Sequence, residues 1–288
     1  MLTIIGFLIV VGSVLGGFSM AGGHVEALIH PSEIVTIGGS ALGALVVMSP
    51  LSVLKSLIKG IISTFLGDKF SKAAYIELFS LMYEIFRKAR MDGLLAIESH
   101  LANPHDSSIF QRYPRISRNH HVTDFIKGSL GPFLDGSVTP QQLRSLLDVE
   151  IRSMEEEHHA PLGVLSKTAD GLPGFGIVAA VLGIVITMEH IDGPVEEIGH
   201  KVGAALVGTF LGILLSYGFI APLVAKLEIM AGKESSFFRA IAAGVLAFVE
   251  GMPPRFAIEV ARRGVAHDMR PAEAEMEKLF KDAEQLNA

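Results

Sequence analysis

Residues 202–225 read VGAALVGTFLGILLSYGFIAPLVA and contain no Asp, Glu, Lys, Arg or His. About 20 consecutive apolar residues in an α-helix cross the ~30 Å hydrocarbon core of a bilayer, so this stretch is long enough to span a membrane. Three more stretches lack ionisable side chains in the same way: residues 1–23, 34–54 and 171–188. The sequence therefore predicts an all-α integral membrane protein with four transmembrane helices and helical cytoplasmic domains.

The basic residues predict how these helices are oriented. All but one of the 24 Lys and Arg residues lie within residues 55–167 or 226–281, and the exception is Lys201. The cytoplasmic flanks of membrane spans carry the excess of Lys and Arg, whereas the two short connections carry mostly Glu and Asp. We therefore expect a multi-pass protein with both termini in the cytoplasm.

The predicted organisation alternates membrane spans with cytoplasmic parts. The first charge-free stretch has neither a basic start nor a clear cleavage site, so we interpret it as a retained span rather than a signal peptide. Transmembrane helices are expected at residues 1–23, 34–54, 171–190 and 201–225, a helical cytoplasmic domain at 55–170, and a helical cytoplasmic tail at 226–288.

The cytoplasmic parts are expected to be helical throughout. Residues 70–101 have apolar side chains at three- and four-residue spacing and predict one long amphipathic helix, which Asn103-Pro104 would end. Residues 237–249 are apolar except for Arg239 but are too few to cross a bilayer. They predict a helix that is packed or lies on the membrane surface.

The composition argues against several classes of function. A net charge of −6 disfavours a nucleic-acid partner, which would require a basic face. The absence of Cys excludes disulfides and thiolate chemistry. The adjacent pairs His120-His121 and His158-His159 would point to different sides of a helix, which disfavours a metal site. Without a phosphate loop, a nucleophile elbow or a zinc motif, we expect no enzyme activity, no cofactor and no metal.

No ionisable side chain is expected at depth in any of the four spans. Proton pumps and ion carriers normally keep an Asp, Glu or His there in spite of its cost. If this chain conducts ions, the titrating group is therefore expected to come from another polypeptide.

Small residues recur within the spans and predict close helix contacts. Glycines four residues apart lie on one face of a helix and allow two backbones to approach each other. The simpler interpretation is packing within one subunit, and the alternative is packing against neighbouring subunits or around a foreign helix. The pairs are Gly12 and Gly16, Gly39 and Gly43, and Gly208 and Gly212.

Two prolines and a threonine stand out within the spans. Pro173 is expected just inside the start of the third span, where a proline loses no helical hydrogen bond. Pro222, one turn before the end of the fourth span, frees the Gly218 carbonyl and predicts a kink or hinge. Thr209 is expected to bond back to the carbonyl of Ala205, with a pore-lining hydroxyl as the alternative.

Two charges in residues 70–101 lack local partners. Glu84 is expected to pair with Lys88 four residues later on a solvated face. Arg90 and Glu98 have no opposite charge three or four residues away, and in one continuous helix they would lie about 12 Å apart along the axis and face the same general side. They fit either a solvated surface or a partner that carries the complementary charges.

Several long motifs resemble the MotA family, the stator subunits of the flagellar motor. Residues 169–183, ADGLPGFGIVAAVLG, are similar to the family signature at the third span, and residues 205–223, ALVGTFLGILLSYGFIAPL, resemble the fourth span closely. The likeness extends over almost the whole chain. It includes the cytoplasmic helix, with Arg87-Lys88-Ala89-Arg90, Gly93, Glu98, Asn103-Pro104 and Ile109-Phe110, and the tail, with Pro254-Arg255-Phe256-Ala257-Ile258-Glu259 and Arg262.

The resemblance implies a location, partners and roles for particular residues. It implies a homo-oligomeric ring, a pentamer, in the lipid of the bacterial inner membrane. The ring would surround MotB-like single-span subunits, each of which carries the proton-binding Asp. Arg90 and Glu98 match the charges that engage the rotor protein FliG, and Pro173 and Pro222 match two prolines that couple ion flow to movement.

The choice of ion rests on Ala180. Sodium-driven relatives of the PomA type carry Thr at this position, and a hydroxyl oxygen can replace a water ligand of sodium whereas a methyl group cannot. Thr209 occurs in both kinds and does not discriminate. The resemblance therefore favours a proton channel whose ion flow drives the rotor. A sodium-driven stator and an energiser of outer-membrane processes of the ExbB or TolQ type are the alternatives, and a solute transporter that works alone is disfavoured because no charge is expected within the membrane.

Overall fold

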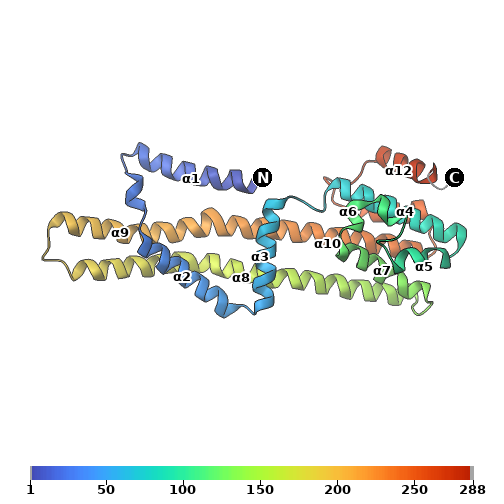
Figure 1. Ribbon diagram of the computed structural model, residues 1–288, viewed down its shortest axis with the longest axis horizontal. Coiled ribbons are helices and arrows are strands. Elements are labelled where there is room, and N and C mark those ends of the chain that lie inside the picture. Colours follow the sequence, from blue (N-terminus) through green and yellow to red (C-terminus); the bar gives the residue numbers. More distant parts are fainter. Residues whose placement is uncertain (1, 286–288) are drawn as a thin grey trace. The chain divides into compact units, whose positions relative to one another are not determined.

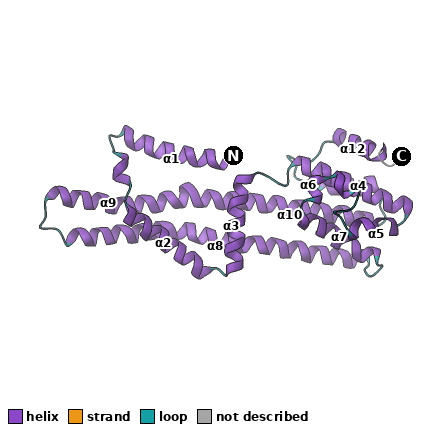
Figure 2. Cartoon of the chain, in the orientation of Figure 1, coloured by secondary structure: helices purple, strands orange, loops and turns teal. Residues whose placement is uncertain are grey.

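The computed structural model describes residues 2–285, and they form helices joined by short loops, with no strand among them (Figure 2). The predicted all-α fold is confirmed over this range. The chain divides into two compact units, which we call unit 1 (Met1–Gly67 and Glu157–Ile229) and unit 2 (Asp68–Glu156 and Met230–Ala288). The long helices α8 (Pro140–Met188) and α10 (Ala221–Val249) contribute residues to both units.

Unit 1 holds the apolar helices. Four helices in the described part of the chain are long and apolar enough to cross a membrane: Leu2–Met20, Val25–Met48, Pro140–Met188 and Val195–Val249. In Figure 1, α8 and α9 run side by side and are joined by a short loop. The elements of the unit are α1 (Leu2–Met20), η1 (Val25–Leu28), α2 (Pro31–Met48), α3 (Leu51–Leu66), part of α8, α9 (Val195–Ile213), the π-helical segment η3 (Leu214–Ile220) and the start of α10.

The surface of unit 1 is apolar, as expected of a protein in contact with lipid or with other subunits. No residue of α1 is buried. On α8, the side chains of Ile177, Val178, Val181 and Leu182 are each about half exposed. Such a continuous apolar surface is rare on a monomer in water and marks a membrane or protein interface.

The helix ends of unit 1 differ from the predicted spans. The predicted second span, residues 34–54, is interrupted, because α2 ends at Met48 and Ser49 is extended before Pro50. A residue before proline is driven out of the helical region. The helix that contains the third predicted span does not begin at residue 171, because α8 continues unbroken from Pro140 to Met188.

Unit 2 has a large apolar core. The rings of Phe86 and Phe248 stack with their centroids 4.3 Å apart, so the helix predicted for residues 237–249 is a packed core helix within α10. Phe79 and Phe110 are fully buried beside them. The elements of the unit are α4 (Lys72–Asp92), α5 (Leu95–Ala102), η2 (Phe110–Arg112), α6 (Pro114–Ser117), α7 (His120–Leu134), the start of α8, the rest of α10, α11 (Pro254–Arg263) and α12 (Glu273–Gln285).

The single amphipathic helix predicted for residues 70–101 is two helices. Gly93, at a φ of +90°, separates α4 from α5. A positive φ is accessible to glycine at no steric cost and is strained for other residues. The chain can therefore turn at Gly93. The prediction that Arg90 and Glu98 lie on one continuous helix, about 12 Å apart along its axis, is wrong.

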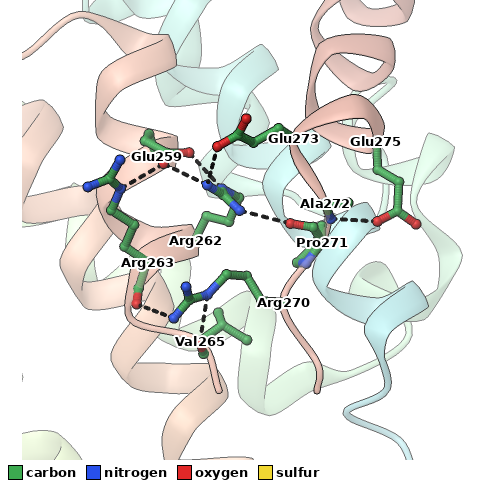
Figure 3. A network of polar contacts seen from close by, with 9 residues as sticks. All are labelled: Glu259, Arg262, Arg263, Val265, Arg270, Pro271, Ala272, Glu273 and Glu275. Carbon is green, nitrogen blue, oxygen red and sulfur yellow. Dashed lines mark hydrogen bonds and ion pairs between the residues drawn. The ribbon is translucent and has the colours of Figure 1, made fainter. Parts of the chain in front are cut away.

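A polar network around Arg262 fixes the end of α11 (Figure 3). The buried guanidinium donates to both carboxylate oxygens of Glu259 at 2.6 and 2.7 Å and to the Pro271 carbonyl at 3.0 Å. Hydrogen bonding from Arg262 lowers the pKa of Glu259 to about 2. The tail residues that resemble the MotA family thus hold α11 to the segment that leads into α12.

Candidate functional site

The contact between α8 and α9 is built from glycines. A Cβ added to Gly212 would lie 2.6 Å from the Leu172 carbonyl oxygen, and one added to Gly176 would lie 2.9 Å from the carbonyl oxygen of Gly208. Real Cβ atoms do not approach other atoms so closely. The two helix backbones therefore touch, as small residues allow in membrane proteins. For Gly208 and Gly212, the structure supports the interpretation of packing within one subunit.

The other two glycine pairs face open space. A Cβ added to Gly12, Gly16, Gly39 or Gly43 meets nothing within 4 Å among the residues described. These two faces therefore do not pack against the part of the chain that the structure describes. The alternative interpretation, contact with neighbouring subunits or a foreign helix, therefore stays a prediction for them.

Pro173 lies in the interior of α8, not at the start of a helix. The expectation that it costs no hydrogen bond was therefore wrong, because a proline inside a helix leaves the carbonyl four residues earlier without its donor. That carbonyl belongs to Ala169, and the Ser216 hydroxyl donates to it at 2.7 Å. Ser216 is only 1% exposed. A buried carbonyl left unpaired costs free energy, and Ser216 removes this cost.

Ser216 was missed by the sequence analysis. A single serine in an apolar span is an ordinary observation, and its partner Ala169 lies on a different helix. The position of Pro173 could have pointed to it. A proline inside a helix leaves the carbonyl four residues earlier, here that of Ala169, without its usual donor, so a donor from another helix is expected.

A π-helical segment, η3, precedes Pro222. The backbone N–H of Ala221 donates to the Ser216 carbonyl five residues earlier, as in a π-helix. Pro222 has no N–H to continue the ordinary pattern, and π segments are frequent at functional sites in helices. The sequence predicted a kink or hinge at this place, and the structure has a wider turn there that carries Ser216.

The structure brings Ala180 and Thr209 to the same contact. A Cβ on Gly208 would lie 3.3 Å from the backbone nitrogen of Ala180, and one on Gly176 would lie 3.3 Å from the Thr209 Cα. Both residues are half-buried. Over residues 2–285 the Thr209 hydroxyl makes no hydrogen bond, so the expected bond to the Ala205 carbonyl is absent.

A carboxyl group, that of Glu33, is buried at this contact. Because α2 begins at Pro31, Glu33 belongs to its first turn. Its Oε2 atom lies 2.6 Å from the position that a Cβ on Gly208 would take. With the second span expected at residues 34–54, Glu33 would instead lie in the connection before it.

Arg90 and Glu98 are exposed on unit 2. Arg90 lies in the last turn of α4 and Glu98 in the first turn of α5. Neither forms an ion pair or a side-chain hydrogen bond with any other residue that the structure describes. Met91 and Leu95 lie between Arg90 and Glu98 in the sequence, and their periodicity gave no sign of a role. Met91 is 69% exposed and Leu95 is 81% exposed. Apolar side chains with charges at the rim are typical of a protein interface.

Glu84 does not pair with Lys88 on a solvated face. It is 2% exposed, accepts a hydrogen bond from the Tyr113 hydroxyl and lies 3.0 Å from the Arg112 guanidinium. Burial raises the pKa of Glu84, although Tyr113 and Arg112 oppose this shift. Lys88 instead pairs with Asp92 at 3.2 Å. The predicted pair of Glu84 and Lys88 is therefore absent. Helical spacing does not show which face of α4 is covered, so it could not reveal that Glu84 is buried.

No cluster of three or more potential metal ligands occurs in the part of the chain that the structure describes. The α8–α9 contact offers the Glu33 carboxyl group, the Ser216 hydroxyl group and backbone atoms.

Comparisons with known proteins agree on one family. Residues 4–93 match the family motility protein A N-terminal, and residues 117–239 match the MotA/TolQ/ExbB proton channel family. The chain is 37% identical to motility protein A of Salmonella typhimurium, over 96% of this chain and 94% of that protein. It is 36% identical to motility protein A of Escherichia coli, with the same coverage.

Solved structures share the fold. The MotAB structure from C. jejuni has a TM-score of 0.77 and 22% identity, over 94% of this chain and 98% of that one. The flagellar MotAB stator complex from Bacillus subtilis has a TM-score of 0.75 and 24% identity, over 96% of this chain and 98% of that one. At these identities the likeness concerns the arrangement of the helices.

Proposed function

The chain belongs to the motility protein A family, and we propose that it is a stator subunit of the bacterial flagellar motor that forms a proton channel with a MotB-like partner. The proposal rests above all on the identity of 36–37% to motility A proteins along nearly the whole chain. The match of residues 4–93 to the motility protein N-terminal family favours a flagellar role over an ExbB- or TolQ-like energiser.

In the proposed assembly, copies of this chain form a pentameric ring in the inner membrane around the single-span helices of the partner, with both termini in the cytoplasm. The open glycine faces of α1 and α2 support contacts of this kind, because a Cβ on these glycines meets no atom of residues 2–285 within 4 Å. The partner would supply the Asp that carries the proton. The solved relatives are complexes of MotA with MotB by name.

The proposed mechanism uses the small energy of one proton. A proton that crosses ~100 mV releases about 2.3 kcal/mol, which biases a step between neighbouring subunits without unfolding a helix. Protonation of the partner's Asp removes a buried charge and loosens its hold on α8 and α9, so the ring turns by one subunit. The π-helical segment η3 joins α9 to α10 just before Pro222. The backbone hydrogen-bond pattern can change there during the step.

The proposed output is a push on the rotor protein FliG. Arg90 and Glu98 are exposed, have no ion-pair partner in residues 2–285, and flank exposed apolar side chains. Charges act strongly only on partners within the screening length of ~8 Å. These residues would therefore act by direct contact with complementary charges.

The experiment exchanges the two charges. Arg90→Glu with Glu98→Lys is expected to abolish swimming in a strain that lacks its own stator, while the protein still accumulates in the membrane with its partner. The matched control is Arg152→Glu with Glu156→Lys, two exposed charges of unit 2, which should leave swimming unchanged. Normal motility of the Arg90/Glu98 variant would refute the role of these residues. Loss of motility in the control as well would mean that unit 2 does not tolerate charge exchange.

Ala180 is the proposed determinant of ion choice. It lies at the α8–α9 contact and offers a methyl group where sodium would require an oxygen ligand. Swimming speed should be unchanged when sodium is removed from the medium. Arrest without sodium would overturn the proton assignment and favour a sodium-driven stator.

A further inference from the structure

Glu33 is a buried carboxylic acid without a partner. Its side chain is 7% exposed, and its Oε2 atom has no hydrogen-bond partner in the described part of the chain. Within residues 2–285, only two other buried side-chain atoms lack a hydrogen-bond partner, one on Ser49 and one on Glu84. Of these two buried acids, Glu84 has the Arg112 guanidinium 3.0 Å away. Glu33 has no ion pair with any residue that the structure describes.

The carboxyl group occupies the space that Gly208 leaves open. The point where a Cβ on Gly208 would sit is 2.6 Å from Glu33 Oε2, 3.1 Å from the Ala179 Cβ and 3.3 Å from the Ala180 nitrogen. The next residue of α9 is Thr209. The acid therefore lies where α2, α8 and α9 meet, close to Ala180, the proposed determinant of ion choice.

Packing alone does not explain an acid at this position. Glu33 starts a stripe on α2 that continues with Ile37 and Ala41, which pack with Leu172 and Ala179 of α8 in one apolar cluster. An apolar side chain would complete that stripe. A buried carboxylate without a partner costs several kcal/mol, and ionisable residues retained within membrane segments mark ion and proton pathways.

Few other ionisable groups surround Glu33. His30, at the N-cap of α2, is the one whose charge acts on it, and the His30 ring bonds to the Ala27 carbonyl. On η1 there is Glu26, and α1 has none. The remaining candidates are the nearest ionisable residues along the two helices that pack against α2. On α9 they are His200 and Lys201, and Lys201 pairs with Glu197 at 3.0 Å. On α8 the nearest is Asp170, and Glu189 follows the end of that helix.

We propose that Glu33 is a proton-binding site of this chain, which relays protons from the non-cytoplasmic side to the acid of the partner. A hydronium ion gives its proton to the Glu33 carboxylate and leaves as water. The Glu33 carboxylic acid then gives the proton to the partner's carboxylate and becomes a carboxylate again, so no charge or atom is lost. This inference rests on the proposed function, which supplies the partner's acid.

The test measures proton flux into liposomes that contain the complex with the partner, under an imposed pH gradient. Glu33→Gln keeps the size and polarity but cannot carry a proton, and it is expected to lower the flux by at least about tenfold, as for loss of a proton-transfer group. Glu33→Asp keeps a carboxyl group and should retain flux with a shifted pH profile. The matched control Glu26→Gln removes an exposed acid of the preceding η1 turn and should leave the flux unchanged.

The outcomes separate the site from the function. Wild-type flux in Glu33→Gln would overturn the relay, whatever the effect on swimming. If Glu33→Gln fails to assemble, Glu33→Asp decides, because a shifted pH profile supports the relay and an unchanged profile overturns it. If the unaltered chain conducts protons through Glu33 but does not restore swimming to a strain without a stator, the site stands and the flagellar function falls.

Discussion

The α8–α9 contact in unit 1 and the core of unit 2 are held together in opposite ways. The contact consists of glycine, alanine and a buried serine, and its backbones touch. The core of unit 2 is filled by large side chains such as Phe79, Phe86 and Phe110. In water the burial of apolar area stabilises a fold, whereas in lipid that driving force is absent and helices associate through close packing and hydrogen bonds.

The difference predicts opposite sensitivities to substitution. The contact should fail when a side chain is enlarged or a hydrogen bond is removed, and the core should fail when a side chain is shortened. Each prediction below tests one side of this difference.

The largest effect is expected from Gly212→Leu. A side chain at this position would collide with the Leu172 carbonyl, because even a Cβ would lie 2.6 Å from its oxygen. The helices would have to separate, so we expect loss of swimming and of protein assembled in the membrane. The control is Gly199→Leu on the same helix, where a Cβ meets nothing within 4 Å. Normal accumulation of Gly212→Leu would show that α8 and α9 do not need backbone contact.

A somewhat smaller effect is expected from Phe86→Ala in unit 2. Removal of a buried aromatic ring that stacks on Phe248 should lower the free energy of unfolding by about 3–5 kcal/mol. Thermal unfolding of the full chain in detergent would measure it. Phe256, which is 56% exposed, provides the control, since Phe256→Ala should change stability by less than about 0.5 kcal/mol. Equal effects of the two variants would contradict the assignment of the core.

The features that sequence alone predicted correctly depend on local properties. The four apolar helices follow from long stretches without charge. That residues 237–249 are helical follows from their composition, and the sequence left open whether this helix is packed or lies on the membrane surface. The closeness of Gly208 and Gly212 to a second helix follows from their spacing. These properties are present in the residues themselves, so no knowledge of distant partners was needed.

The features that were missed depend on residues far away in the chain. Pro173 can lie inside α8 because Ser216 of another helix satisfies the freed carbonyl. Glu84 is buried because Arg112 and Tyr113 reach it from a different segment, which spacing along α4 does not reveal. The burial of Glu33 depends on which helices close over it. Helical periodicity describes the face of one helix but not what covers that face.

A moderate effect is expected from Ser216→Ala. This substitution leaves the Ala169 carbonyl unpaired and should cost about 1–3 kcal/mol of stability. Pro173→Ala restores the N–H that the carbonyl lacks, so in that background Ser216→Ala should cost much less. A double-mutant cycle followed by thermal unfolding in detergent measures this coupling. Additive effects of the two substitutions would mean that Ser216 does not compensate for Pro173.

The smallest effect is expected from Glu84→Gln, and it appears as a pH dependence. Burial raises the pKa of Glu84 above its ordinary value of 4.5, so the folded state holds this proton more tightly than the unfolded state does. The stability that the group contributes is therefore fully present below about pH 4.5 and is lost as the pH rises through the folded pKa. Glutamine does not titrate, so the wild type should lose stability relative to the variant over that window. Glu156→Gln, which removes an exposed carboxyl group, is the control, and parallel pH profiles for the two variants would show that the Arg112 and Tyr113 contacts fully offset the burial of Glu84.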